Sequence, residues 1–163
     1  MDSQELKTKI ESFDIEISFP EEETQFLTLT VNPSKLHELA KQLKEDSDTS
    51  FDYMFCQTGI DWEENLEVVY HLRSTSHGHE VVVRTQITDR ENPTVDSVYD
   101  LWKTADFHER EIFDLLGIRF NNHPDLRRIF LDDDWEGYPL RKDYDTPDYY
   151  RGMPVPKDKT YWE

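Results

Sequence analysis

The chain has 163 residues, with 36 acidic and 18 basic side chains and a formal net charge of -18. This length fits one domain, and so strong a negative charge disfavours general binding to nucleic acids or to anionic membrane surfaces. A lone cysteine, Cys56, excludes an intrachain disulfide and a metal site built from several thiolates, and no run approaches the roughly 18 apolar residues of a membrane span.

A helix and a strand hairpin are predicted at the start of the chain. Apolar residues recur on one helical face between residues 3 and 13, with Asp2 or Ser3 available as the N-cap. Alternation of apolar and polar residues then predicts two strands, over residues 15–19 and 26–31. The turn between these strands holds Glu21, Glu22 and Glu23.

The middle of the chain predicts a second helix and three more strands. Apolar residues at three- and four-residue spacing follow Asn32-Pro33-Ser34, and a polar stretch from Glu45 ends the pattern. Residues 51–58, 66–73 and 80–87 are rich in β-forming side chains and predict a meander. Cys56 lies within the first of these runs, where we expect a buried strand residue rather than a nucleophile.

One or two helices are predicted between Val95 and Leu116, where apolar residues recur and Gly117 suits a helix C-terminus. The elements together predict an α+β fold for residues 1–120. This two-layer domain would have a mainly antiparallel or mixed sheet of about five strands, with helices packed on one face.

The composition changes after residue 120, and residues 121–163 predict an extended C-terminal arm. This segment holds five of the eight prolines and five of the eight tyrosines, which disfavours long regular elements. Its aromatic side chains cannot bury themselves alone. An arm lying on a partner protein is favoured, and an arm folded back on its own domain is the alternative.

His108 and Glu111 are the first candidates for chemistry, because their spacing places both on one helix face. A metal site there would need further ligands from another element, so a solvated or intersubunit face is favoured. A free enzyme using His108 with Glu111 or Glu109 as acid and base is a further alternative. The sequence contains no glycine-rich dinucleotide or phosphate loop and no nucleophile elbow.

Residues 132–143 partly match a calcium-binding loop, which would make the chain a stand-alone calcium- or metal-binding protein. The matching positions are Asp132, Asp134, Glu136, Gly137 and Asp143. Pro139 interrupts the loop, and Pro147 leaves no room for a following helix. The match is therefore interpreted as accidental, with calcium binding as the minor alternative.

Three runs near the C-terminus, Glu109–Phe120, His123–Ile129 and Asp134–Tyr144, carry a family resemblance. They closely resemble the signature of the C-type (30 kDa) subunit of the proton-pumping NADH:quinone oxidoreductase known as respiratory complex I. Upstream, Gly59-Ile60-Asp61 and Leu66–Leu72 look like the strand region of that family. No fused domain of the large quinone-pocket subunit follows in this sequence, so we expect the free-standing form.

The resemblance implies a structural subunit without a redox centre or an active site of its own. It would lie in the hydrophilic arm, peripheral to the cytoplasmic side of the inner membrane, and support electron transfer from NADH to quinone only within the complex. Its partners would be the large, D-type quinone-pocket subunit and the B-type and I-type iron–sulfur subunits. Those partners would carry NADH, FMN, iron–sulfur clusters and quinone.

An equivalent subunit of a related ferredoxin-, F420- or hydrogenase-linked membrane complex fits the same resemblance. Residue by residue, the resemblance implies interface roles and no catalytic, cofactor-binding or metal-binding role. It carries these roles to Glu109, Arg110, Glu111, Asp114, His123, Asp125, Arg127, Arg128, Trp135, Glu136, Arg141, Lys142 and Asp143. One departure is Asp145, which stands where many members have proline and puts the path of the following residues in question.

Overall fold

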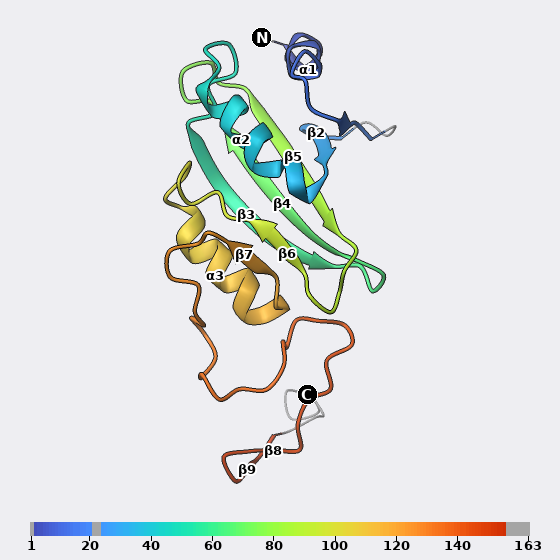
Figure 1. Ribbon diagram of the computed structural model, residues 1–163, viewed down its shortest axis with the longest axis vertical. Helices are drawn as coiled ribbons and strands as arrows, with labels where there is room; N and C mark the ends of the chain where they lie inside the picture. Colours follow the sequence, from blue (N-terminus) through green and yellow to red (C-terminus); the bar gives the residue numbers. More distant parts are fainter. Residues whose placement is uncertain (1, 21–23, 156–163) are drawn as a thin grey trace, which may run out of the picture.

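The computed structural model describes residues 2–20 and 24–155 and shows a mixed five-stranded sheet with helices on one face (Figure 1). The predicted turn at Glu21–Glu23 and the last eight residues of the predicted arm lie outside the described residues. The strand order is β1-β2-β5-β4-β3. The strands are β1 (Ile17–Ser18), β2 (Leu27–Val31), β3 (Tyr53–Asp61), β4 (Leu66–Arg73) and β5 (Glu80–Ile87).

The sheet is mixed because β2 runs parallel to β5, while the other neighbouring pairs are antiparallel. The predicted α+β class, the hairpin and the three-stranded meander are confirmed. Since side chains alternate between the two faces of a strand, the register separates a core face from an outer face. One row of the core face, read across the sheet, is Leu29, Val83, Tyr70 and Gln57.

The first two helices begin where the sequence predicts. The Asp2 side chain caps α1 (Ser3–Glu11) and forms a capping box with Glu5. The Asn32 side chain accepts the Ser34 N–H at the start of the short 3-10 helix η1 (Pro33–Lys35), which leads into α2 (Leu36–Glu45). The apolar faces of both helices are buried in the core.

The third helix, α3 (Ala105–Leu116), packs closely on β3. Gly59 permits this approach, because a Cβ there would lie 2.5 Å from Leu116 Cδ1 and 2.9 Å from Ile112 Cγ2. Gly117 ends the helix in the left-handed conformation, as its position in the sequence suggests.

The predicted helix from Val95 is wrong at its start. Residues Thr94–Asp96 form β6, which pairs in parallel with β7 (Arg119–Asn121). In the sequence, β7 follows α3. Val95, Val98 and Trp102 are buried at helical spacing, but a strand followed by turns brings them into the core. The partner of β6 is distant in sequence, so local periodicity gave no sign of it.

The chain beyond β7 is irregular until a short hairpin of β8 (Tyr149–Tyr150) and β9 (Met153–Pro154). In Figure 1 this orange and red segment continues from β7, which lies beside α3, loops away from the sheet and carries the hairpin at its far end. The expectation that long regular elements are missing here is confirmed for residues 122–148.

Candidate functional site

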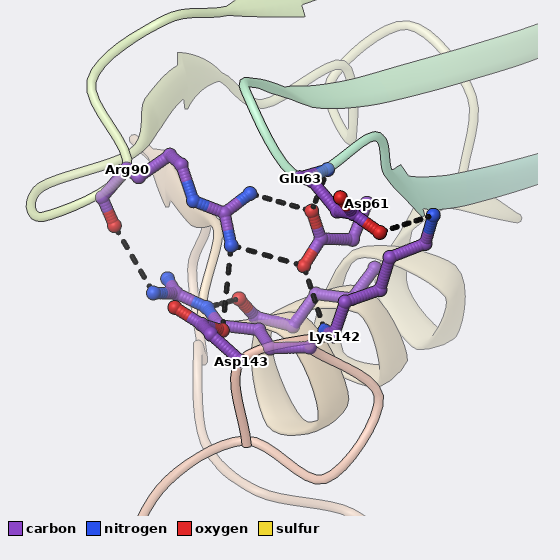
Figure 2. A network of polar contacts seen from close by, with 7 residues as sticks. Asp61, Glu63, Arg90, Lys142 and Asp143 are labelled. Carbon is purple, nitrogen blue, oxygen red and sulfur yellow. Dashed lines mark hydrogen bonds and ion pairs between the residues drawn. The ribbon is translucent and has the colours of Figure 1, made fainter.

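Buried carboxylates hold the C-terminal segment against the domain, and the first of them is Asp61 at the end of β3 (Figure 2). The guanidinium of Arg90 donates to both carboxylate oxygens, and its Nη2 lies 3.0 Å from Oδ2. The same carboxylate accepts the backbone N–H of Lys142 at 2.9 Å and that of Glu63 at 2.8 Å. This bidentate pairing and the two N–H bonds occupy both oxygens of Asp61.

The residues next to Lys142 extend this network. Asp143 lies 3.3 Å from Arg90, and the Lys142 ammonium lies 3.5 Å from Glu63. Arg141 donates from Nε to the carbonyl oxygen of Leu116 at 2.7 Å and from Nη1 to that of Arg90 at 3.0 Å. Residues 141–143 therefore connect the end of β3, the loop after β5 and the C-terminus of α3. The hydrogen bonds from Arg90, followed by those from the two backbone N–H groups, outweigh burial and hold the pKa of Asp61 well below its usual range.

We call a buried carboxylate that holds the C-terminal segment an anchor. Asp114, on α3, is the second anchor after Asp61 and is fully buried. Its Oδ2 accepts the backbone N–H groups of Ile129, Phe130 and Leu131 at 3.0, 2.7 and 3.0 Å. Its Oδ1 accepts Nη1 of Arg128 at 2.7 Å. Burial opposes ionisation, but these donors outweigh it, and the pKa of Asp114 lies below its usual value.

Arg128 continues from this anchor to later parts of the segment. Its Nη2 donates to the carbonyl oxygens of Trp135 at 3.1 Å and Gly137 at 3.2 Å. Tyr138 then lies over Gly117, where an added Cβ would meet its ring at 2.5 Å. The irregular chain from residue 128 to 143 is thus attached to the domain at several points.

Glu109, the third buried carboxylate, faces the loop before α3. Its Oε2 accepts the Ser97 hydroxyl at 2.5 Å, and its Oε1 accepts the Val98 N–H at 2.9 Å. His123 Nε2 lies 3.9 Å from Oε2, and His123 Nδ1 accepts the backbone N–H of Asp125 at 3.1 Å. Burial outweighs these hydrogen bonds and raises the pKa of Glu109 to about 7.

The remaining residues of the resemblance divide between interior and surface. Arg110 is buried and donates to the carbonyl oxygen of Arg127 at 3.3 Å. Arg127 pairs with Asp125 at 2.9 Å, and both are exposed. The half-buried Trp135 packs against Tyr150 at a ring distance of 4.8 Å. Glu111 and Glu136 are exposed. Most residues to which the resemblance gives interface roles therefore form contacts within this chain. Their predicted contacts with other subunits stay predictions.

The candidate calcium ligands are divided between two places. Asp132 and Asp134 both accept the Tyr150 hydroxyl, and Arg151 lies 3.3 Å from Asp132 and 2.8 Å from Asp134. Asp143 is bound to Arg90 instead. The loop is therefore not folded around a cation. Within residues 2–20 and 24–155, no group of three His, Cys, Asp or Glu side chains is placed to hold a metal ion.

Asp61 and Arg90 received no role from the sequence, although they form the centre of the first anchor. The one signal in the sequence was an aspartate at the end of an apolar strand. The arginine that pairs with it, Arg90, lies in a distant loop. Cys56 is a strand residue as expected, yet it is half-buried rather than buried because it lies on the outer face of β3.

The family and the relatives found by comparison with known proteins agree with one another. Residues 29–150 match the family described as "Respiratory-chain NADH dehydrogenase, 30 Kd subunit". The chain is 38% identical over 142 residues to the C-type subunit of NADH-quinone oxidoreductase from Chlorobium phaeobacteroides, with 85% of each chain covered. It is 52% identical over 118 residues to the C/D-type subunit of NADH-quinone oxidoreductase from Phocaeicola vulgatus, covering 72% of this chain and 22% of that protein.

The chain spans about a quarter to a half of the length of several curated relatives, with 22%, 24% and 48% of three of them covered. Its fold is similar to a chain of the membrane-bound sulfane sulfur reductase, an archaeal respiratory membrane complex. That likeness has a TM-score of 0.75 and 27% identity, and it covers 89% of this chain and 86% of the other. None of the helices in the described part is long and apolar enough to cross a membrane.

Replacing Asp114 tests the second anchor. We expect Asp114→Asn to lower the free energy of unfolding by about 3 kcal/mol, because the amide NH₂ leaves a buried donor group without an acceptor. Asp125→Asn is the control, since it breaks only the exposed pair with Arg127 and is expected to cost under about 1 kcal/mol. Urea unfolding measures both, and equally small effects would contradict the anchor.

The raised pKa of Glu109 predicts a pH dependence. Between pH 4.5 and about 7 the unfolded chain releases this proton first, so the free energy of unfolding falls as the pH rises through this window. Glu109→Gln removes this contribution. Between pH 5 and pH 8 we expect the free energy of unfolding of the variant to fall by about 2 to 3 kcal/mol less than that of the wild type. Glu111→Gln, at an exposed neighbour, is expected to follow the wild type; a Glu109→Gln profile parallel to the wild type would refute the assignment. Urea unfolding at both pH values gives the comparison.

Proposed function

The chain belongs to the family of the 30 kDa subunit of respiratory-chain NADH dehydrogenase, and from this we propose that it is a structural subunit in the hydrophilic arm of a proton-pumping NADH:quinone oxidoreductase. In this proposal it carries no redox centre and catalyses no step of its own. NADH, FMN, iron–sulfur clusters and quinone belong to partner subunits. The complex would place it on the cytoplasmic side of the membrane, without membrane contact of its own.

The observation that carries this proposal is the anchored C-terminal segment. Its base is attached through Asp61 and Asp114, so the segment leaves the domain in a defined direction. Several of its large apolar side chains nevertheless face solvent: Phe130, Leu140, Tyr149 and Met153 are 59–68% exposed. Side chains of this kind usually mark contact with another protein.

The proposed task is mechanical. Electron transfer and a quinone pocket tolerate little displacement of their groups, so neighbouring subunits must stay in register. We propose the D-type quinone-pocket subunit and the B-type and I-type iron–sulfur subunits as these neighbours. The carboxylates at the anchors suit this role rather than acid–base chemistry, because the oxygens of Asp61 and Asp114 already accept several donors.

A related membrane complex with different electron chemistry is the second candidate. The observation favouring it is the structural similarity to the sulfane sulfur reductase chain, over 89% of this chain. A protein that only positions its neighbours can serve complexes with different donors and acceptors.

Recovery of partners with the tagged full chain from membranes in mild detergent tests the proposal. We expect flavin- and iron–sulfur-bearing NADH-oxidising subunits, identified by mass spectrometry, to be recovered with it. The triple change of Leu140, Tyr149 and Met153 to serine is expected to reduce this recovery at least fivefold, because it removes exposed apolar contacts.

The control changes three exposed helix residues, Gln4, Lys41 and Glu45, to serine and is expected to leave recovery within twofold of the wild type. Recovery of a hydrogenase- or ferredoxin-linked set would support the second candidate. A chain recovered without any partner would contradict both candidates.

A further inference from the structure

The edge strand β3 is long and carries little charge. It is nine residues long, whereas β1 at the opposite edge has two. Natural edges are commonly shortened, charged or interrupted by proline. In β3 the one acidic or basic side chain is Asp61, and Arg90 neutralises it. This nearly uncharged strand contrasts with the chain as a whole, in which 33% of the residues are charged.

A row of large apolar side chains follows β3 on the outer face of the sheet. We call Tyr53, Phe55, Ile60 and Trp62 the β3 strip. Tyr53, Phe55 and Trp62 are 47%, 39% and 49% exposed. Their side chains lie away from the helices, because the register places the core-facing Met54, Gln57 and Gly59 on the other face.

An irregularity in the strand produces this arrangement. The register of β3 against β4 shifts between Met54 and Cys56, so Phe55 is an extra residue without a partner. Its ring lies 5.6 Å from that of His71 on β4 and 6.1 Å from that of Tyr53. The bulge thus adds an aromatic ring to the outer face at the free edge.

Charges beside the β3 strip are paired within the chain. Glu67 and Arg84 lie 2.7 Å apart, and Arg73 and Glu80 lie 3.4 Å apart. Trp62 donates its indole N–H to Glu67 at 2.9 Å. The outer face is thus balanced in charge on a chain whose net charge is -18. A neutral apolar surface fits such a face, whereas a phosphate-bearing ligand would find no surplus cation.

We propose that the β3 strip is a second contact with a neighbouring protein, whose occupant is a neutral, apolar segment of another subunit of the complex lying along the free edge of β3. This inference rests on the proposed function, and it is independent of the C-terminal segment. The exposed aromatic side chains of the β3 strip, those of Tyr53, Phe55 and Trp62, suit one part of a larger contact among several subunits.

The test is recovery of partner subunits with a full-length Tyr53→Glu/Phe55→Glu variant. Placing two carboxylates on the edge should reduce recovery at least tenfold relative to the wild type. The matched control Gln4→Glu/Thr8→Glu adds the same charge at exposed positions of α1 and is expected to stay within twofold of the wild type. Thermal unfolding of each isolated chain checks that the variants fold.

Hydroxyl-radical footprinting of the wild type avoids any variant that fails to fold. We expect oxidation of Trp62 to be at least fivefold slower in the complex than in the isolated chain. Unchanged Trp62 oxidation, or wild-type recovery with the Tyr53→Glu/Phe55→Glu variant, would overturn the β3 strip while the proposed function stands. A wild-type chain that recovers no partner would overturn both. A dimer of isolated chains in sedimentation, abolished by Tyr53→Glu/Phe55→Glu, would overturn the proposed occupant.

Discussion

The hydrogen bonds from three consecutive backbone N–H groups to the Asp114 carboxylate determine how the second half of this protein is organised. A segment without helix or strand satisfies only some of its own backbone donors, through turns, and leaving the others buried and unpaired is costly. Asp114 accepts those of Ile129, Phe130 and Leu131, and Arg128 neutralises the charge that this requires. An irregular, proline-rich chain can therefore have a fixed path over α3.

The chain uses its few arginines in a consistent way. Arg90 and Arg128 hold buried carboxylates, whereas Arg110 and Arg141 donate to carbonyl oxygens of the connecting segments. A guanidinium suits these positions because its planar fork presents several donors in fixed directions. The buried polar groups of the domain therefore mainly hold its connecting segments in place. This agrees with the proposed role of holding neighbouring subunits in register.

Local sequence patterns were sufficient for much of the sheet and two helices. Strands β4 and β5 have the predicted bounds, and Asp2 and Asn32 cap helices as their residue types suggest. The region from Val95 was predicted wrongly, because burial against β7 imposes a strand where the spacing is helical. Tertiary pairing of this kind overrides local preference and leaves no mark on the spacing itself.

The anchors were only partly accessible from the sequence. The family motifs pointed to Asp114, Arg128 and Arg141 but gave them contacts with other subunits, and their observed partners are in this chain. Asp61 and Arg90 were missed because their pairing joins a strand end to a loop 29 residues later. Contact with other subunits depends on surfaces that a single chain leaves exposed, such as the side chain of Tyr149.

Amide hydrogen exchange in the isolated full-length chain tests the central claim most directly. If buried carboxylates fix the C-terminal segment, the N–H groups of Ile129, Phe130, Leu131 and Lys142 will exchange at least about 100-fold more slowly than in an unstructured chain. Exchange of these amides at the unprotected rate, with β4 and β5 still protected, would show that the segment is not anchored and would contradict this account.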